Sequence, residues 1–526
     1  MERERSKPES HAPERSLQRE GRLPVRVICL FLLAYFVTRL SSLGALPIFL
    51  DESVHIQWAE RLVHEGRVLR PIGAGRVLAV VAYGLALPFE DRLWAARAIA
   101  SVVGSLTLIF IMLLADRLWG RRGALIAGGL SLLSPFALVY DRLALSDGFL
   151  TAALTGMMLA VLVLVHGSSG RWVQFAIVLS IALSVFSKVS ALLFLGSLPL
   201  AALILPTDRI ATLRRLFAPT VIGLAASTPM LWFFYANSGE IREQHIVDPL
   251  TSGSVMFSTL RDMSQWLLGY FTLPTLLTAA ISFVLLRDRR VLWLAASCAV
   301  PFALFALFSQ PWSARYVLPT LPPLLVLAAG GIDLVSRLVS PRRAAWTAVG
   351  LTLLASMTAL PFSWALLTHP EDAPFPHDDR IQLVTGWPAG YGVREMAERI
   401  RRESAAGPLE VYVDTGANRT VAAGLTILLH GAHAVERTEG DFGSAEFRAR
   451  MKPVPGRRAL IAAGPRSDQL DFKPLLQGFG LKRLEVYQRP GGEWAGTLFE
   501  IQAVSTPASI GDPPEGLRCS RIGVKR

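Results

Sequence analysis

The sequence predicts an α-helical polytopic membrane protein with about eleven transmembrane helices and a C-terminal extracytoplasmic α/β domain. Two features of the chain carry this prediction. Hydrophobic residues make up 52% of the 526 residues, and the mean hydropathy is +0.41. The apolar residues also fall in runs of about 17–22, the length of helix that crosses ~30 Å of hydrocarbon. Because lipid offers backbone groups no hydrogen-bond partners, we expect these runs to be helices.

The predicted spans follow one another from residue 25 to residue 366 and define a transmembrane domain. Their approximate bounds are 25–44, 93–115, 123–139, 149–166, 172–187, 189–205, 216–236, 265–286, 291–308, 316–336 and 344–366. Residues 1–24 form a polar tail ahead of them. The first apolar run lacks a small-residue cleavage site, so we expect it to be a retained span.

The first outer loop, residues 45–92, holds two further predicted helices. The segment VHIQWAERLVHEGRVLR (54–70) has apolar residues at helical spacing, which is typical of an amphipathic helix lying along a membrane interface. The apolar stretch 77–89 contains Gly84 and Pro88, and we interpret it as a second interfacial helix. A span at this position would break the alternation of charged loops that follows.

Arginine gathers in alternate connectors between the predicted spans. The arginine-rich connectors are 116–122, 166–171, 207–215, 287–290 and 336–343. The positive-inside rule places them, and the N-terminus, in the cytoplasm of a multi-pass plasma (inner) membrane protein. An odd number of spans then puts the C-terminal domain outside, together with the turn 140–148 and a middle loop at about 237–264.

The net charge of +12 is explained by these loops, so we expect no nucleic-acid partner. The three cysteines, Cys29, Cys298 and Cys519, show neither the spacing of a metal site nor that of a disulfide framework. His55 and His64 lack a third ligand at useful spacing. The chain has no DxD motif, no P-loop and no dinucleotide fingerprint, which disfavours a soluble nucleotide sugar or ATP as substrate. We therefore predict no cofactor, and no metal is indicated.

The C-terminal segment differs in composition and alternates helix-like with strand-like stretches. REMAERIRRE (394–403) has a helical pattern. The strand-like stretches are LEVYVDT (409–415), RALIAAG (458–464), RLEVYQR (483–489) and TLFEIQAV (497–504). This alternation predicts a small α/β domain over residues 367–505, followed by a disordered tail, 506–526.

Seven ionisable residues fall at the outer ends of the predicted spans. They are Asp51, Glu52, Arg97, Arg142, Asp147, Lys188 and Arg315. Charged groups near lipid are costly, so such a set indicates a functional site. The alternative is that each is an ordinary solvated boundary residue, but acids and bases from different hairpins converge on one face.

The chemistry of these residues suits transfer at a phosphate. Asp51 and Glu52 are adjacent and point about 100° apart on a helix, so one can act as base while the other binds an arginine or positions a loop. Desolvation would raise the pKa of a carboxylate there, which suits a general base near neutral pH. Lys188 and Arg315 could offer positive charge to a phosphate. Arg142 and Asp147 either pair with each other or point separately at the substrates.

Several motifs together resemble a known family, in the family's order. The matching pieces are FLDESVH (49–55), WAARAIAS (94–101), RLALSDGFL (142–150), FSKVSALLF (186–194), ARYVLPTLPPL (314–324) and GWPAGYGVREMAE (386–398). The chain resembles the type C membrane glycosyltransferases of glycosyltransferase family 39. This family includes the protein O-mannosyltransferases and the bacterial aminoarabinose transferase that modifies lipid A.

The resemblance implies that a sugar is carried on a polyprenyl phosphate and transferred, with inversion, to a hydroxyl acceptor at the outer leaflet. The acceptor is a protein, a lipid or a glycan. Asp51 matches the family's catalytic base, Glu52 supports it, and Asp147 matches the acid of the second outer turn. Lys188 and Arg315 are the candidates for binding the lipid phosphate.

Arg142 and Arg70 are further candidates for the lipid phosphate. Many relatives carry Lys-Pro-Pro-Leu after the acid pair, whereas this chain has RPIGAGR (70–76), in which Arg70 and Pro71 partly preserve the motif. The altered stretch indicates a different donor or acceptor.

Two other functions are consistent with a polytopic chain. A transporter or flippase of lipid-linked sugars would show internal repeats and broken or charged helices at the bilayer midplane. A non-catalytic scaffold that displays the outer domain predicts no convergence of acids and bases. The charges of this chain gather at one face, which favours the transferase.

Overall fold

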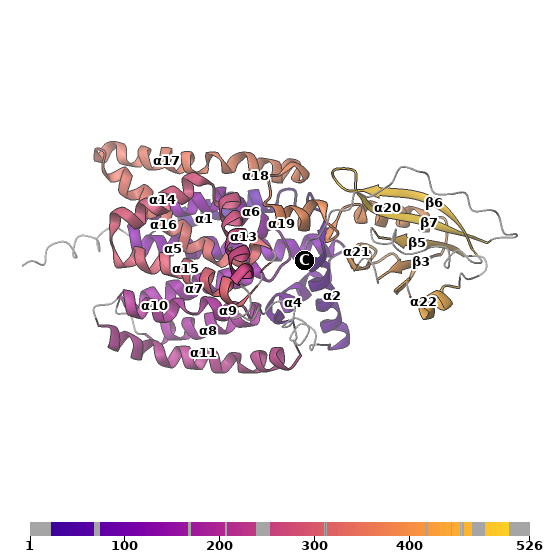
Figure 1. Ribbon diagram of the computed structural model, residues 1–526, viewed down its shortest axis with the longest axis horizontal. Helices are drawn as coiled ribbons and strands as arrows, with labels where there is room; N and C mark the ends of the chain where they lie inside the picture. The colour runs from indigo at the N-terminus through magenta and orange to yellow at the C-terminus, as the bar shows by residue number, and fades with distance from the viewer. Residues whose placement is uncertain are drawn as a thin grey trace, which may run out of the picture.

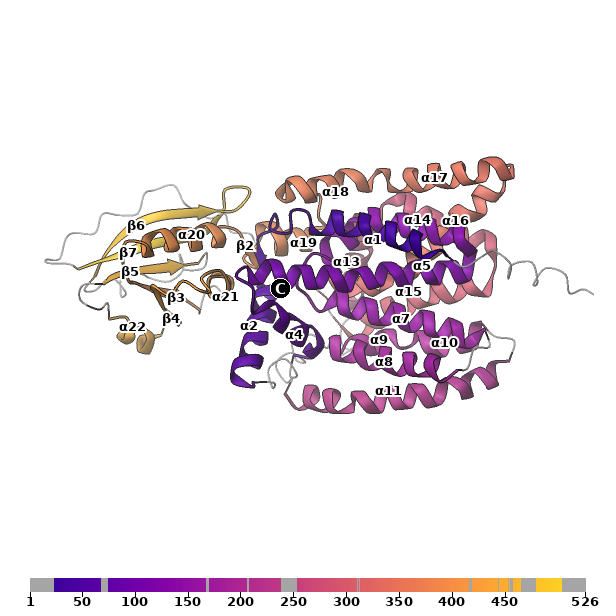
Figure 2. The same ribbon diagram turned by 180° about the vertical axis from the view of Figure 1, so that it is seen from behind.

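A computed structural model describes residues 23–67, 74–166, 170–205, 208–237, 253–309, 311, 313–415, 419–442, 444–452, 454, 457–464 and 479–503. A bundle of helices forms one end of the molecule and a sheet domain forms the other (Figures 1 and 2). The helical body and the C-terminal α/β domain predicted from the sequence are therefore both confirmed.

The helical body contains helices of very different length. In chain order they are α1 (Val25–Leu40), α2 (Leu50–Glu65), α4 (Val77–Tyr83), α5 (Arg92–Leu133), α6 (Pro135–Tyr140), α7 (Asp147–Val165), α8 (Arg171–Ser187), α9 (Ala191–Phe194), α10 (Ser197–Ile204), α11 (Arg209–Asn237), α13 (Gly253–Phe271), α14 (Leu273–Leu286), α15 (Arg289–Phe308), α16 (Leu321–Arg337), α17 (Pro341–Met357) and α18 (Ala359–Thr368). Two 3₁₀ turns, η2 (Gly84–Ala86) and η3 (Ala314–Thr320), extend α4 and precede α16.

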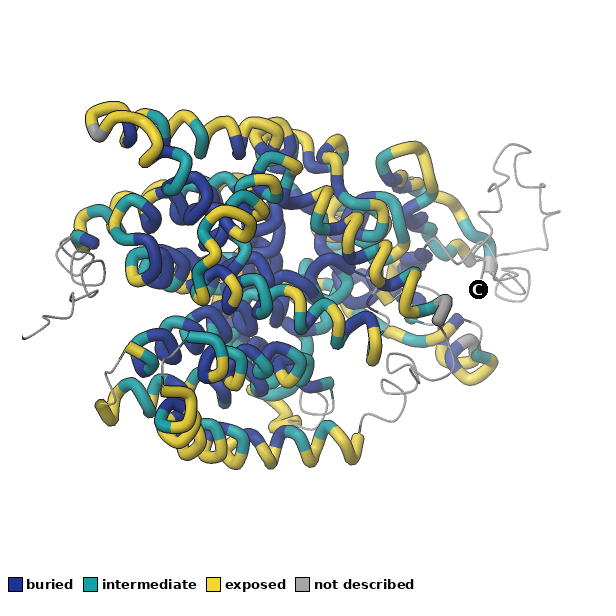
Figure 3. Tube along the Cα trace, turned by 60° about the vertical axis from the view of Figure 1, so that its left-hand side comes forward, coloured by how far each residue is buried: buried dark blue, intermediate teal, exposed yellow. Residues whose placement is uncertain are grey.

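Among the described residues, five helices are long and apolar enough to cross a membrane, or up to seven if each bent pair counts as one span. This result agrees with the predicted membrane character of the chain, whereas the predicted number of about eleven spans stays a prediction. Residues exposed on the outer helices α11 and α17 include Phe217, Trp232 and Trp346, while the centre of the body is buried (Figure 3). Large apolar side chains on the outside of a helical body suit a lipid environment.

The structure differs from the predicted spans at three places. The spans 93–115 and 123–139 fall largely in α5, which is interrupted by non-helical backbone at Gly120 (φ 77°). The predicted span 265–286 consists of α13 and α14, which are bent by 104°. The predicted span 344–366 consists of α17 and α18, bent by 59°. Prolines explain the last two breaks, since Pro274 and Pro361 lie in the first turns of α14 and α18, where a missing N–H is tolerated.

The first outer loop forms two helices, as predicted, with different bounds. The amphipathic helix begins at Leu50 and ends at Glu65, where Gly66 takes the left-handed conformation (φ 64°) typical of a helix end. The stretch 77–89 forms α4 and η2. The predicted middle loop is helical from Gly253 onward, where α13 begins.

The C-terminal domain is a mixed sheet with helices. Its elements are α20 (Val393–Ser404), β3 (Leu409–Asp414), α21 (Arg419–Leu428), β4 (Val435–Gly440), α22 (Ala445–Arg450), β5 (Arg458–Ala463), β6 (Phe479–Gln488) and β7 (Trp494–Ala503). The strand order is β4-β3-β5-β7-β6. Strand β3 is parallel to β4 and β5, and β7 is antiparallel to β5 and β6. The tail 506–526 predicted to be disordered lies outside the described residues.

A connecting segment joins α18 to the sheet domain and contacts the first outer loop. It contains η4 (Pro370–Asp372), α19 (His377–Arg380), one π-helical turn (Ile381–Thr385) and β2 (Ala389–Gly390). Strand β2 pairs antiparallel with β1 (Ile48–Phe49) of the first outer loop. Helix α2 packs on α21, and Gln57 donates to the carbonyl oxygen of Ala423 at 3.2 Å. The sheet domain is therefore held against the loop that carries the acid pair.

Candidate active site

Asp51 lies in the first turn of α2 and pairs with two arginines. Its Oδ2 is 2.7 Å from Nη1 of Arg315, at the start of η3, and 3.3 Å from Nη1 of Arg76. The side chain of Asp51 remains 21% exposed and that of Arg76 remains 19% exposed, whereas that of Arg315 is 3% exposed. Two of these residues were predicted to share a site, and the structure brings them into direct contact.

His55 lies one helical turn after Asp51 and joins the same network. Its Nε2 is 3.2 Å from Nη1 of Arg76, and its Nδ1 is 2.9 Å from the carbonyl oxygen of Ala144. Burial and then the charge of Arg76 lower the pKa of His55 to about 4. A neutral ring that donates to Ala144 and accepts from Arg76 satisfies both contacts. Sequence reasoning considered His55 only as a metal ligand, although its i, i+4 spacing from Asp51 would have indicated this position.

A second ion pair lies beside Arg315. Nζ of Lys188, which directly follows α8, is 2.7 Å from Oδ1 of Asp147, the first residue of α7. The same Nζ lies 3.9 Å from the centre of the Tyr316 ring. Tyr316 directly follows Arg315, so the two ion pairs are neighbours. Residues from four separate predicted hairpins therefore meet at this site, namely Asp51, Asp147, Lys188 and Arg315.

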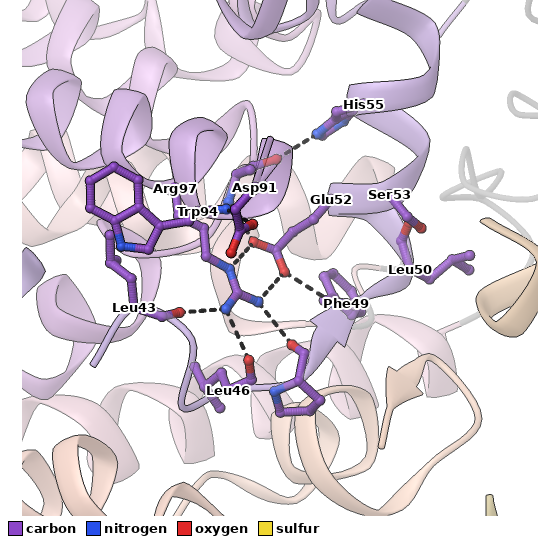
Figure 4. A network of polar contacts seen from close by, with 12 residues as sticks. Leu43, Leu46, Phe49, Leu50, Glu52, Ser53, His55, Asp91, Trp94 and Arg97 are labelled. Atoms are coloured by element: carbon purple, nitrogen blue, oxygen red, sulfur yellow. Dashed lines mark hydrogen bonds and ion pairs between the residues drawn. The ribbon is translucent and has the colours of Figure 1, made fainter. Parts of the chain in front are cut away.

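Glu52 does not share the partners of Asp51; it is fully buried and pairs with Arg97 (Figure 4). Its Oε1 accepts from Nε of Arg97 and from the backbone N–H of Ala144, both at 2.8 Å. Its Oε2 accepts from Nη2 of Arg97 at 2.7 Å and from the N–H of Phe49 at 3.0 Å. Arg97 donates its remaining hydrogens to the carbonyls of Leu43, Leu46 and Pro47. Three of these four bonds, two from Arg97 and one from Ala144, tie the first outer loop to α5 and to the turn after α6.

Arg142 and Asp147 do not pair with each other. Asp147 pairs with Lys188, while Nη2 of Arg142 donates to the carbonyls of Ser41 and Ser42. Burial, with the charges of Arg97 and Arg39, lowers the pKa of Arg142 to about 10. Its Nε and Nη1 have no hydrogen-bond partner among the described residues. Arg70 lies outside the described residues. The roles of Arg70 and Arg142 at a lipid phosphate stay predictions.

The expectation of a raised pKa for Asp51 is wrong. Burial by itself would raise the pKa of this carboxyl, but the attraction of Arg315 and Arg76 is together larger and holds the pKa below its usual range. Sequence reasoning treated Arg76 only as a departure from a motif and did not place it beside Asp51. Asp51 is therefore ionised and ion-paired at neutral pH when no other anion occupies the arginines.

Sequence reasoning also missed Asp379, in α19, which is fully buried. Its carboxylate accepts hydrogen bonds from Tyr140, Tyr270, Ser313 and the N–H of Ala314. Two of these donors directly precede Arg315. Within the described part of the chain, no group of three or more His, Cys, Asp or Glu side chains is placed to hold a metal ion.

Comparison with solved structures shows which fold this chain has. The crystal structure of ArnT from Cupriavidus metallidurans bound to undecaprenyl phosphate is similar over 90% of this chain and 97% of that chain, with a TM-score of 0.59 and 17% identity. The apo structure of the same ArnT gives a TM-score of 0.55 at 17% identity, again over 90% of this chain and 97% of that chain. The chain has the fold of these enzymes, so the resemblance inferred from the motifs is confirmed.

Two further comparisons agree with this fold. Arabinofuranosyltransferase AftD from Mycobacteria is similar over 93% of this chain, with a TM-score of 0.53 and 16% identity, and this chain spans 40% of AftD. The family model described as dolichyl-phosphate-mannose-protein mannosyltransferase matches residues 77–233. That range contains Arg97, Asp147 and Lys188, while Asp51 and Arg315 lie on either side of it. A sequence search of curated proteins finds no match.

Proposed function

We propose that this protein transfers a sugar from a polyprenyl-phosphate carrier to a hydroxyl acceptor at the outer face of the membrane, with Asp51 as general base and inversion at the anomeric carbon. The observation that carries the proposal is the position of Asp51. Its side chain keeps 21% exposure in a network where Asp147 keeps 3% and Glu52 keeps none. A base must reach the acceptor hydroxyl within about 3 Å or through one water, so Asp51 is the carboxylate best placed for that contact.

The two arginines that hold Asp51 also suit the donor phosphate. A phosphodiester can accept the hydrogen bonds that Arg315 and Arg76 give to Asp51 in the free protein. When the phosphate takes these donors, the ionised form of Asp51 loses stabilisation and its pKa rises. Donor binding would thereby turn a weak, ion-paired carboxylate into a stronger base.

The transfer step then balances as a direct displacement. The acceptor oxygen forms a bond to the anomeric carbon, the bond from that carbon to the carrier phosphate breaks, and Asp51 takes the hydroxyl proton. Arg315 and Arg76, with Lys188, stabilise the negative charge of the departing polyprenyl phosphate. Asp147 orients Lys188, and Glu52 holds the first outer loop through Arg97. No metal has a role in this step as proposed.

Asp51→Asn tests the proposal. We expect transfer to fall by about 10²–10⁴-fold, because the base is lost, while undecaprenyl phosphate still binds. Glu65→Gln is the matched control, since Glu65 lies on the same helix, is exposed and pairs with Arg67 at the surface. Each variant would be expressed in a deletion strain, and mass spectrometry of surface glycans and lipids would measure the product. Full complementation by Asp51→Asn would remove Asp51 as the base.

A flippase of lipid-linked sugars is the second candidate, because the break between α13 and α14 resembles the discontinuous helices of transporters. Purified protein in detergent separates the two functions. A transferase forms a new glycosidic bond there, whereas a flippase has no bilayer across which to move its substrate.

A further inference from the structure

The connecting segment between the last membrane helix and the sheet domain contains a buried carboxylate. Asp379 accepts hydrogen bonds at Oδ2 from Tyr140 and from Tyr270, the latter at 2.6 Å. At Oδ1 it accepts from Oγ of Ser313 at 2.9 Å and from the N–H of Ala314 at 3.1 Å. A buried charge is costly unless it is fully hydrogen-bonded, and these four donors, from three segments of the chain, satisfy both oxygens.

Two of the four donors lie immediately before Arg315. Ala314 is the first residue of η3, and Ser313 provides no side-chain cap for this turn. Asp379 instead supplies the acceptor for the free N–H of Ala314, from a segment 65 residues away. The backbone that carries Arg315 is therefore held in place by Asp379.

The other end of the same segment pairs with the residues that immediately precede Asp51. Ala389 and Gly390 pair with Phe49 and Ile48. The N–H of Leu50 donates to the carbonyl of Pro388 at 3.1 Å. Residues 379–390, which we term the outer clamp, thus hold the chain on both sides of the ion pair between Asp51 and Arg315.

We infer that the outer clamp sets the geometry of this ion pair and that Asp379 is a positioning residue for Arg315. The inference rests on the proposed function only for its catalytic consequence, since the contacts themselves are independent of activity. Because α20 begins at Val393, close behind β2, the clamp also connects the sheet domain to the site. A shift of that domain would move Asp51 and Arg315 relative to each other.

Asp379→Asn in the full-length protein tests the inference, with Asp378→Asn as the matched control. Asp378 is the neighbouring acid, but its carboxylate accepts from Nε1 of Trp266 at 2.8 Å and not from residues 313–315. Hydrogen–deuterium exchange in detergent should show faster exchange of residues 313–320 in Asp379→Asn than in the control. Unchanged exchange at 313–320 would overturn the clamp, whatever the activity.

Transfer should fall by about 10–100-fold in Asp379→Asn and by less than about threefold in Asp378→Asn, since small misplacement of a charged group is costly. A double-mutant cycle with Arg315→Lys distinguishes positioning from a general structural role. If Asp379 acts through Arg315, adding Asp379→Asn to Arg315→Lys should cost less than about threefold. Independent, multiplied losses would contradict the inference.

Ser313→Ala is a milder second variant in case Asp379→Asn fails to fold, because it removes one donor to Asp379 and no charge. It should accelerate exchange at 313–320 and should move the acid limb of the kcat/KM profile, which reports the free protein, to higher pH. The reason is that a looser Arg315 stabilises ionised Asp51 less. An acid limb that stays in place, with exchange as in wild type, would refute the clamp. Absence of transfer by wild-type protein would instead refute the proposed function, while the exchange experiment would still decide the clamp.

Discussion

Asp51 and Glu52 are adjacent in the chain but have different partners. Their roughly 100° separation on α2 turns Asp51 toward Arg315 and Arg76 and turns Glu52 toward Arg97. The sequence predicted that the two acids could not share one contact. It could not assign the partners, because these come from segments far along the chain. The predicted direction of the pKa shift of Asp51 was wrong for the same reason. The sequence pattern indicates that Asp51 is desolvated, but it does not show that Arg315 and Arg76 lie beside it.

Glu52→Gln should destabilise the protein more than Asp51→Asn does. The substitution leaves the buried guanidinium of Arg97 without its counter-charge, which costs about 3–5 kcal/mol when one partner of a buried pair is removed. Asp51 is partly exposed, and its removal also relieves the cost of its burial. Thermal unfolding of the detergent-solubilised variants measures the difference. An unfolding temperature for Glu52→Gln equal to that of wild type would show that Arg97 is not held in this way.

The pH dependence should differ between the free and the donor-bound protein. Arg315 and Arg76 lower the pKa of Asp51 in the free protein despite its burial, so Asp51 stays ionised as the pH falls through its ordinary range. A donor phosphate that takes the arginines raises this pKa. The acid limb of kcat, which reports the donor complex, should therefore lie at higher pH than the acid limb of kcat/KM. Coincident limbs would contradict competition between phosphate and Asp51 for the arginines.

At the scale of elements, hydropathy located most helices but not their breaks. Span length follows from the thickness of the bilayer, so apolar runs such as 172–187 match α8 closely. The bend at Thr272, just before Pro274, and the interruption at Gly120 are not visible in hydropathy, because both depend on local backbone conformation. The strand pair of β1 and β2 was also missed, since each strand has only two residues and no pattern of its own.

Gly390→Ala tests the importance of that strand pair. A Cβ at Gly390 would overlap the carbonyl oxygen of Ile48, so β1 and β2 could no longer pair closely. We expect transfer to fall by about 10-fold or more, because Asp51 lies two residues after β1. Gly350→Ala in α17 is the control, since an added Cβ there meets nothing within 4 Å and alanine favours a helix. Equal activity of the two variants would contradict a role for the strand pair.

At the scale of the whole molecule, the sheet domain is connected to the helical body at the site. Arg92 of α5 bridges the two, with Nη1 at 2.9 Å from Oε1 of Glu60 and Nη2 at 2.8 Å from Nε2 of His430. Cavities of about 610 and 670 Å³ open along this junction around His430 and His433. A movement of the sheet domain would therefore shift the first outer loop.

The predicted orientation can be tested by cysteine labelling in intact cells. Glu493→Cys, in an exposed turn of the sheet domain, should react with a membrane-impermeant maleimide from outside. Arg121→Cys, in an arginine-rich connector, should react only after permeabilisation. Cys519→Ser in the same background removes the native thiol of the C-terminal tail. Labelling in the reverse order would place the site and the sheet domain on the cytoplasmic side.

The sequence by itself determined the membrane character, the α/β nature of the C-terminal domain and the residues Asp51, Lys188 and Arg315 as members of one site. These follow from composition, periodicity and short motifs, which are local properties of the chain. Only the tertiary structure decided that Arg76 and His55 join Asp51, that Glu52 belongs to Arg97, and that Asp379 holds the segment of Arg315. Those contacts join residues up to 66 positions apart, and a carboxylate's charge state depends on whichever cations the fold brings within reach of it.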